Sequence, residues 1–288
     1  MDTNKVDIAI VGNGPAGVSA AINAKIRNKT FILFGSKNGS LSVQKSISIK
    51  NYPGFSDISG IEFNKKLEKQ LKEMKIDTVY ERITGIYDLG GYFALLADKK
   101  QYQADAVILA AGAEVVKAIP GEREFLGRGV SYCATCDGNL YKGKKIAVIC
   151  DSREDEHEVS YLAELAKEVY YFPMFESLLK ADNITILKDK PVSVCGEQSA
   201  KEIVLKSGES VEIDGVFFLK QSVSADVLLN GIEMEEGNIK TDRKMATSVS
   251  GCFAAGDCTG RPYQIAKAVG EGNVACHSAI EFLAAKRS

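Results

Sequence analysis

Near its start the chain reads Val6-Asp7-Ile8-Ala9-Ile10-Val11, an apolar run, followed by the turn Gly12-Asn13-Gly14-Pro15-Ala16-Gly17. Gly12 permits the tight turn, Gly14 lets a phosphate approach the backbone, and Gly17 lets the next helix pack closely on the strand. Free N–H groups at the start of that helix attract an anion. The opening residues therefore predict a nucleotide-binding unit of strand, turn and helix.

A helix over 15–28 and a strand over 30–34 complete a βαβ unit, which implies a parallel sheet with a crossover helix. The pattern restarts with a strand over 145–150, a helix over 154–166 and a strand over 168–172. Short β-forming runs follow each unit and indicate small antiparallel meanders. The sequence thus predicts an α/β protein with two doubly wound, Rossmann-like domains.

The second of these domains is predicted to be inserted in the first. An apolar run at 252–255 and a terminal helix at 262–285 complete the first domain better than they would form a third. We expect residues 1–114 and 244–288 to form a discontinuous nucleotide-binding domain, and residues 115–243 to form the central domain. Two polar linkers would join them.

The first domain lacks the acidic residue that binds ribose in a simple NAD site, because Phe34 is followed by Gly35 and Ser36. Near the C-terminus, Gly256-Asp257 stands between an apolar strand and the terminal helix. That carboxylate can accept hydrogen bonds from ribityl or ribose hydroxyls, although Asp at such a place is also a common helix N-cap. Together with the first turn, it favours a flavin over NAD.

The strand over 145–150 runs into acidic residues instead of glycines. These residues are Asp151, Glu154, Asp155, Glu156 and Glu158, with Arg153 and His157 between them. Two like charges about 5 Å apart at an effective dielectric near 20 repel by roughly 3 kcal/mol, so this turn should repel a pyrophosphate. The alternative is a solvated helix start, where acidic residues suit the helix dipole. Both interpretations predict that NADPH is not bound here in the usual way.

Two cysteines with a two-residue spacer, Cys133 and Cys136, lie between the two turns, and Asp137 follows them. A zinc half-site needs two further ligands, which the other cysteines and the two histidines do not supply at suitable spacing, so no metal is expected. Two inert core cysteines are a second alternative. A reversible disulfide fits best, because the short spacer keeps the sulfurs within bonding distance. Asp137 can then handle the proton that moves when the pair opens.

The other five cysteines are expected to serve packing. An odd number of widely spaced cysteines does not form a secreted disulfide framework. Four of them look like small core residues: Cys150, Cys195, Cys252 and Cys276. Cys258 adjoins Asp257, so it is either a packing residue or a neighbour of the cofactor.

The composition excludes several classes of protein. The 288 residues are 45% hydrophobic and 26% charged, as in ordinary globular proteins, with a net charge of −2. There is no basic footprint for nucleic acid, no polybasic membrane anchor, and no apolar run near the roughly 20 residues of a spanning helix. The first strand begins almost at once, without an export signal. We expect a cytoplasmic protein.

Residues 127–138, GRGVSYCATCDG, closely resemble the active-site signature of low-molecular-weight thioredoxin reductases. The first glycine turn, Asn51-Tyr52-Pro53-Gly54, Ala111-Gly112-Ala113 and Phe253-Ala254-Ala255-Gly256-Asp257 support the likeness. The resemblance implies a homodimer with non-covalent FAD in the domain built from both chain ends. It implies FAD contacts from Gly12, Asn13, Gly14, Pro15, Ala16, Gly17, Gly35, Ser36, Leu41, Asn51, Ala111, Gly112, Gly256, Asp257, Tyr263, Gln264 and Ile265.

The same resemblance assigns roles around the cysteine pair. Cys136 would face the flavin, Cys133 would attack the disulfide of thioredoxin, and Asp137 would be the acid/base. A dithiol packed on a flavin cannot also meet thioredoxin, so we expect a hinge motion about the two linkers.

Several parts of that family's pattern are altered in this chain. The NADPH turn, the basic cluster after the next strand and the Gly-containing segment near 217–221 differ, and Tyr263 stands where an Arg commonly precedes Gln264. This combination resembles the ferredoxin-dependent flavin thioredoxin reductases of anaerobic bacteria, which dispense with pyridine nucleotide. The resemblance implies ferredoxin or flavodoxin as donor, thioredoxin as acceptor, and no bound NADPH.

Two other functions stay open at this point. One is a related flavoenzyme that uses NAD(P)H by an unusual mode or serves another disulfide partner. The other is a non-catalytic flavin redox sensor. Low-potential ferredoxins near about −400 mV and thioredoxin near about −270 mV differ by roughly 6 kcal/mol for two electrons, so the ferredoxin route is downhill.

Overall fold

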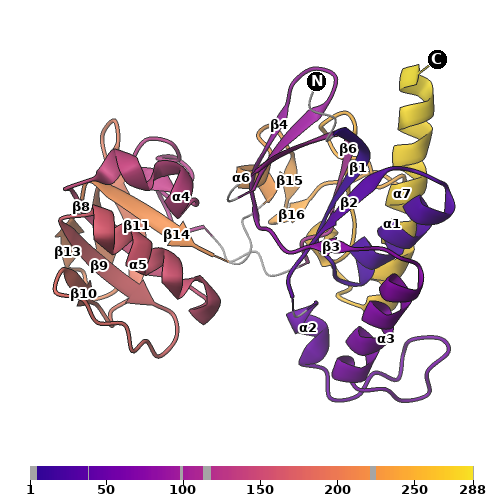
Figure 1. Cartoon of the computed structure of the whole chain (residues 1–288), viewed down its shortest axis with the longest axis horizontal. Helices are drawn as coiled ribbons and strands as arrows, with labels where there is room; N and C mark the ends of the chain where they lie inside the picture. The colour runs from indigo at the N-terminus through magenta and orange to yellow at the C-terminus, as the bar shows by residue number, and fades with distance from the viewer. Residues whose placement is uncertain (1–4, 38, 98–99, 113–117, 221–224, 288) are drawn as a thin grey trace. The chain divides into compact units, whose positions relative to one another are not determined.

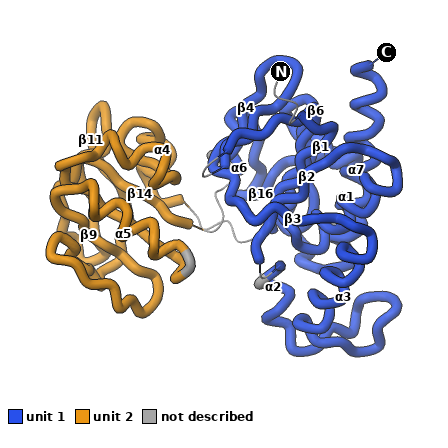
Figure 2. Tube along the Cα trace, in the orientation of Figure 1, with its two compact units in different colours: residues 1–115, 225–288 blue, residues 116–224 orange. Residues whose placement is uncertain are grey.

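The computed structural model describes residues 5–37, 39–97, 100–112, 118–220 and 225–287. The chain divides into two compact units, which Figure 2 shows in different colours. Unit 1 comprises Met1–Val115 and Ala225–Ser288, and unit 2 comprises Val116–Ser224. Unit 2 is therefore an insertion in the sequence of unit 1.

The second boundary between the units comes earlier in the chain than the sequence suggested, so residues 225–243 belong to unit 1. Leu229 forms a β-bridge with Ile86, and the Ser248 hydroxyl donates to the Gly231 carbonyl at 3.0 Å. The polar stretch near the expected linker thus supplies hydrogen bonds within unit 1. Polarity there reflects turn structure and not a connection between domains.

Unit 1 is built on a seven-stranded mixed sheet in the order β3-β2-β1-β6-β5-β4, with β17 also paired to β6. Its strands are β1 (Lys5–Val11), β2 (Phe31–Phe34), β3 (Thr78–Val79), β4 (Ile83–Asp88), β5 (Phe93–Ala97), β6 (Gln101–Leu109) and β17 (Cys252–Ala254). Strands β1, β2, β3, β6 and β17 run parallel, and β4 and β5 form an antiparallel meander on β6. A separate hairpin joins β15 (Met234–Glu235) to β16 (Asn238–Ile239).

The first and last helices of unit 1, α1 (Pro15–Ile26) and α7 (Ile265–Arg287), lie side by side (Figure 1). The Ser19 hydroxyl donates to the Val269 carbonyl at 2.7 Å. Buried alanines and the side chains of β1 form one core with both helices. The end of the chain therefore completes the domain that its beginning starts.

The remaining helices of unit 1 are short or amphipathic. They are α2 (Leu41–Gln44), α3 (Gly60–Glu73), α6 (Ala225–Leu228) and the 3-10 turn η3 (Asp257–Thr259). A capping box begins α3: Ser59 accepts from the Glu62 N–H at 3.2 Å, and the Glu62 carboxylate accepts from the Ser59 N–H at 3.3 Å. Phe63 and Leu71 are on its buried side.

Unit 2 has a five-stranded parallel sheet in the order β10-β9-β8-β14-β7. Its strands are β7 (Val130–Ser131), β8 (Lys145–Cys150), β9 (Glu168–Pro173), β10 (Ile184–Ile186) and β14 (Gly215–Leu219). A second, antiparallel sheet contains β11 (Pro191–Gly196), β12 (Ala200–Leu205) and β13 (Ser210–Glu212). The helices are α4 (Ala134–Asp137), η1 (Gly138–Tyr141), η2 (Arg153–Asp155) and α5 (Glu156–Leu165).

The central strands of unit 2 explain why its sheet is parallel. Strand β14 is buried along its whole length, and β8 is buried except at its first residue. Such continuous apolar strands suit a parallel sheet that is covered on both faces. Both units thus have the predicted α/β, doubly wound, Rossmann-like architecture with small antiparallel meanders.

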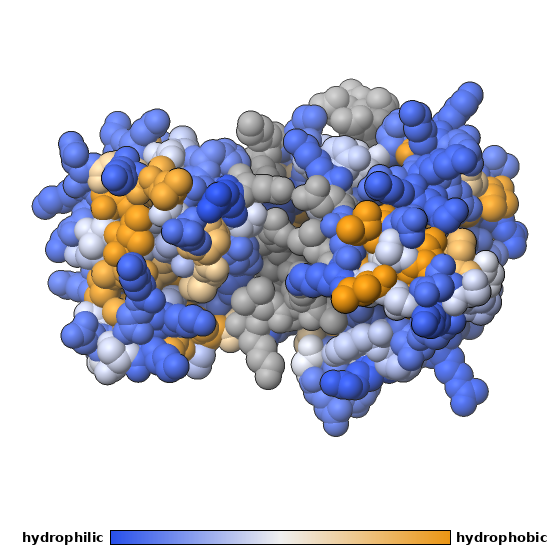
Figure 3. Space-filling view, turned by 90° about the horizontal axis from the view of Figure 1, so that it is seen from below, coloured by the Kyte–Doolittle hydropathy of each residue, from blue (hydrophilic) through white to orange (hydrophobic). Residues whose placement is uncertain are grey.

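The surface has the mixed polar and apolar character expected from the composition. On the face shown in Figure 3, each unit is mainly hydrophilic with smaller apolar areas. Among the described helices, none combines the length and the apolar character needed to cross a membrane.

Candidate functional site

The two cysteines of the CATC motif are joined in a disulfide at the start of α4. The Cα atoms of Cys133 and Cys136 are 5.3 Å apart, and the Cys136 N–H donates to the Cys133 Sγ at 3.1 Å. A helical turn takes about 3.6 residues, so two cysteines that are three positions apart lie on the same side of it.

The two halves of the disulfide differ in exposure and in hydrogen bonding. Cys133 is only 6% exposed, whereas Cys136 is exposed. A backbone N–H that points at a sulfur stabilises the thiolate, and here that sulfur belongs to Cys133. The geometry therefore favours attack at Cys136 with Cys133 as the leaving sulfur.

Asp137 is held next to the disulfide by a serine that sequence reasoning did not single out. The Ser131 hydroxyl donates to the Asp137 Oδ2 at 2.6 Å and accepts from the Cys133 N–H at 3.1 Å. In the sequence, Ser131 is marked only by its place at the end of the strand that leads into the cysteine pair. Burial, with Asp137 as the next cause, raises the pKa of the nearby Tyr141. Asp137 is thus connected through the Ser131 hydroxyl to the backbone of Cys133.

The glycine turn of unit 1 requires close backbone approach at two positions. A Cβ at Gly12 would overlap the Ala110 carbonyl oxygen, and one at Gly17 would overlap the Gly12 carbonyl oxygen. At Gly14, the N-cap of α1, a Cβ would come no nearer than 3.6 Å to Ser40. The fully described helix α1 has no side-chain cap and no acidic residue in its first turn. Its first N–H groups are therefore suited to an anion.

The end of β2 is tied to this turn through Asn13. Its side-chain amide donates to the Ser36 carbonyl at 2.8 Å, and its Oδ1 accepts from the Ser36 N–H at 3.2 Å. Gly35 lies against the same side chain, where a Cβ would overlap it. The side chain of Leu41 lies outside the described part of the chain. Asn13 therefore joins the two loops at this edge of the sheet.

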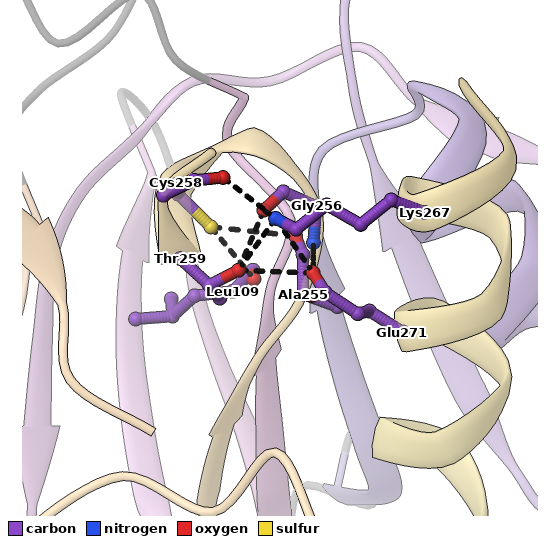
Figure 4. Close-up of polar contacts among 8 residues, drawn as sticks. Leu109, Ala255, Gly256, Cys258, Thr259, Lys267 and Glu271 are labelled. Carbon is purple, nitrogen blue, oxygen red and sulfur yellow. Dashed lines mark hydrogen bonds and ion pairs between the residues drawn. The ribbon is translucent and has the colours of Figure 1, made fainter. Parts of the chain in front are cut away.

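An ion pair on α7 holds the Gly256 turn, as Figure 4 shows. The Lys267 Nζ donates to the carbonyls of Gly256 and Gly260 at 2.8 and 2.7 Å. The Glu271 carboxylate, 3.1 Å from Lys267, accepts from the Gly256 N–H and the Thr259 hydroxyl, each at 2.9 Å. The sequence interpretation did not include this pair. Lys267 and Glu271 could have been found there as opposite charges at i,i+4 spacing on the terminal helix.

The two residues that follow Gly256 have different surroundings. Burial raises the pKa of Asp257, with Glu271 adding to the effect and Lys267 opposing it. Burial also raises the pKa of the Cys258 thiol to about 12, and this thiol donates to the Ala255 carbonyl at 3.3 Å. Cys258 is therefore a packing residue, and Asp257 is a half-buried carboxyl beside the turn.

The other predicted cofactor residues of unit 1 differ in exposure. Pro15 and Ala16 are buried, Ala111, Gly112 and Ile265 are half-buried, and Asn51, Tyr263 and Gln264 are exposed. A Cβ on Gly256 would lie 3.0 Å from the Ala16 Cβ, so the first glycine turn and the Gly256 turn meet there. The Arg261 guanidinium lies 5.4 Å from the centre of the Tyr263 ring.

The acidic start of α5 in unit 2 is partly turned inward. Glu156 Oε1 accepts from the Tyr171 hydroxyl at 3.0 Å and from the Ser177 hydroxyl, and Glu158 is buried. The interpretation of a solvated helix start is therefore wrong for the buried Glu158, and Glu156 is only half-buried. The other interpretation, repulsion of a pyrophosphate, stays a prediction. The side chain of Glu154 lies outside the described part of the chain.

The remaining cysteines are mostly core residues. Cys150, Cys252 and Cys276 are buried as expected, and burial raises the pKa of each to about 12. Cys195, in β11 of the antiparallel sheet, is only half-buried and so is not the core residue that was expected. Among the described residues, no group of three or more His, Cys, Asp or Glu side chains is placed to hold a metal ion.

Comparisons with known proteins give consistent results. Residues 6–150 and 167–272 match the family described as pyridine nucleotide-disulphide oxidoreductase. The chain is 35% identical to the thioredoxin reductase of Bacillus subtilis, over 96% of this chain and 95% of that protein, and 36% identical to that of Treponema pallidum, over 98% of each. A solved structure of a ferredoxin-flavin thioredoxin reductase from Clostridium acetobutylicum has 44% identity and a TM-score of 0.89, covering 100% of this chain and 99% of that one.

Proposed function

We propose, from the premise that this chain belongs to the pyridine nucleotide-disulphide oxidoreductase family and is a thioredoxin-disulfide reductase within it, that reduced ferredoxin and not NADPH is its electron donor. The observation that carries the proposal is the contrast between two helix starts. The first turn of α1 has no acidic residue, whereas Asp151 and Asp155 precede α5 and its first turn carries Glu156 and Glu158, whose side chains are half-buried and buried within unit 2. The similarity to a ferredoxin-flavin thioredoxin reductase supports the same donor.

The chain is a flavoprotein by family, and the residues of unit 1 fit FAD. At Gly14, just before α1, the backbone carries no side chain, and a Cβ added there would meet only Ser40, at 3.6 Å. Asp257 offers a carboxyl for ribityl or ribose hydroxyls, and the Gly256 turn that carries it is held by α7. When bound there, FAD would supply the electron pair that opens the Cys133–Cys136 disulfide.

The chain's own residues account for the exchange with thioredoxin. Reductive opening adds two electrons to the sulfur pair and gives two thiolates, and Asp137 can give or take the proton that accompanies them. The Cys133 thiolate then attacks the disulfide of thioredoxin and forms a mixed disulfide. Cys136 attacks Cys133 in that mixed disulfide, which restores the enzyme's own disulfide and releases thioredoxin as a dithiol.

Some finer features stay predictions of the sequence. These are flavodoxin as a second donor, a homodimeric state and a cytoplasmic location. The hinge between the units is also a prediction, and its basis is that a flavin and thioredoxin must both reach one disulfide.

The donor assignment is tested without oxygen on the full chain with bound flavin. Reduced ferredoxin should support thioredoxin reduction, and NADPH should support it at least about 10²-fold less, because roughly 3 kcal/mol of repulsion corresponds to that factor in affinity. The measurement is the number of thioredoxin thiols formed per minute with each donor. Equal rates with NADPH would favour the pyridine-nucleotide alternative, and no thiols with either donor would favour the redox sensor.

Changing Glu271 to alanine should loosen the flavin. It removes the acceptor of the Gly256 N–H and the ionic partner of Lys267, so we expect FAD affinity to fall about tenfold or more. Flavin released on dialysis measures the effect. The matched control is Glu281→Ala on the same helix. The ion pair of Glu281 with Lys244 is exposed, so its loss should not change flavin retention. Equal flavin retention in both variants would contradict the role of Glu271.

A further inference from the structure

Unit 2 contains a buried ion pair that the exchange reaction does not use. Glu122 is 1% exposed and Lys220 is 5% exposed, and the Lys220 Nζ lies 2.6 Å from the Glu122 Oε1. Lys220 directly follows β14, and Glu122 lies in the turn that precedes β7. The pair therefore joins two segments that are 98 residues apart in the chain.

The same carboxylate reaches the residue next to the redox disulfide. The Tyr132 hydroxyl donates to Glu122 Oε1 at 2.6 Å, and the Ile119 N–H donates to Glu122 Oε2 at 2.9 Å. The Tyr132 ring is buried and lies 5.9 Å from the Phe218 ring, over which the Lys220 ammonium also sits at 4.5 Å. Tyr132 is thus fixed at its hydroxyl and along its ring.

Stability alone is a weak reason for such a pair. Removing two charges from water is costly, and replacing a buried ion pair by apolar residues of similar size is often neutral or stabilising. What the pair does supply is a charged acceptor at a fixed point, held by three donors on separate segments. A strong, short hydrogen bond to such an acceptor limits where the donor can lie.

We propose that Glu122 is a positioning residue for the Cys133–Cys136 disulfide and acts through the Tyr132 hydroxyl, with Lys220 as the buried partner that holds the Glu122 carboxylate in place. The backbone before Cys133 is then fixed from two sides. Ser131 accepts from the Cys133 N–H, and Tyr132 is anchored in the core of unit 2. Thiol–disulfide exchange needs the attacking and leaving sulfurs in line, so freedom at Tyr132 would slow it.

The inference rests on the redox role proposed for this disulfide, but its test uses dithiothreitol as reductant. The result is therefore independent of ferredoxin, NADPH and thioredoxin. The full chain with its flavin is mixed with dithiothreitol, quenched with an alkylating agent and analysed by mass for opened Cys133–Cys136. Melting temperature is recorded for each variant.

Three variants separate the hydrogen bond from the charge. Tyr132→Phe removes only the hydroxyl. Lys220→Met with Glu122→Gln removes both charges but keeps an acceptor for Tyr132, while Lys220→Met with Glu122→Leu removes the acceptor too. Lys145→Met is the control, because its ion pair with Glu168 at 3.9 Å is partly exposed.

We expect the disulfide of Tyr132→Phe and of the Lys220→Met, Glu122→Leu double variant to open about tenfold more slowly than that of the parent. Small displacements of reacting atoms reduce a rate by up to about 10²-fold. The Glu122→Gln pair and Lys145→Met should open at the parental rate. Any one of three results would overturn the proposal. The Glu122→Gln double variant could open as slowly as the Glu122→Leu double variant, Tyr132→Phe could open at the parental rate, or the rates could simply follow melting temperature across all variants.

Discussion

Changing Cys133 to serine should abolish thioredoxin reduction and lower turnover by more than about 10³-fold. A serine hydroxyl cannot form a disulfide with Cys136, so no sulfur pair is left to exchange. Serine is close to cysteine in size, Cys133 is a buried helix cap in unit 2, and the residues expected to bind the flavin belong to unit 1. Flavin content and melting temperature should therefore stay at the parental values. The measurement is thioredoxin thiols formed with reduced ferredoxin.

The companion variant Cys136→Ser assigns the exchanging sulfur. It should also lose turnover, but its Cys133 thiolate can still attack the disulfide of oxidised thioredoxin, which frees one thioredoxin thiol. Alkylation of that thiol should preserve the mixed disulfide, because Cys136 is no longer there to open it. The Cys133→Ser variant should trap no thioredoxin. Cys136 is the exposed member of the pair, so exposure alone would predict trapping on Cys136. The two variants therefore distinguish the two sulfurs. Thioredoxin trapped on Cys136 of the Cys133→Ser variant would reverse the assignment.

Local sequence patterns were sufficient for the architecture. The apolar runs at 6–11 and 30–34, with the glycine turn and an apolar helix between them, predicted β1, α1 and the parallel strand β2. Gly12 and Gly17 do pack too closely to admit a side chain. The run at 145–150 predicted β8 in the same way, since a strand buried on both faces must be continuously apolar. These signals depend on neighbours in the chain, and neighbours are visible in a sequence.

Long-range polar contacts were not visible in the same way. Glu122 and Lys220 are 98 residues apart, and nothing near either of them marks it as buried or paired. Charged residues are usually exposed, so a sequence interpretation places both on the surface. The ion pair on α7 was missed for a related reason: an i,i+4 pair usually stabilises an exposed helix face, and only the fold shows that Lys267 and Glu271 reach the Gly256 turn.

The acidic start of α5 shows the limit of reading charge from sequence. Composition predicted repulsion of a phosphate at that turn, and the first turn of α5 does carry two carboxylates. It did not show that the Tyr171 and Ser177 hydroxyls bind Glu156. Glu156 is thus a carboxylate held by hydroxyls of its own unit, and its orientation could not be read from the charge pattern.

Changing Gly17 to valine should remove flavin from the protein altogether. Any Cβ at Gly17 would overlap the Gly12 carbonyl oxygen, a backbone atom that cannot move aside without displacing the turn. Gly14→Ala tests the turn more gently, because its Cβ would come no nearer than 3.6 Å to Ser40. We expect this variant to fold normally but to bind FAD about 10²-fold more weakly, since the methyl group stands where a phosphate approaches the backbone. Equilibrium dialysis of FAD and apoprotein melting temperature measure the two effects separately.

Gly270→Ala is the matched control for both changes. A Cβ at Gly270 meets nothing within 4 Å, and alanine is preferred over glycine inside a helix such as α7 by about 1 kcal/mol. This variant should bind FAD like the parent and melt no earlier. Because Gly14 and Gly270 both accept a methyl group sterically, a difference in FAD affinity between their variants isolates the approach of the cofactor to the turn. Parental affinity in Gly14→Ala would mean that the phosphates do not lie against α1, and the fit of FAD to the Gly12–Gly17 turn would have to be abandoned.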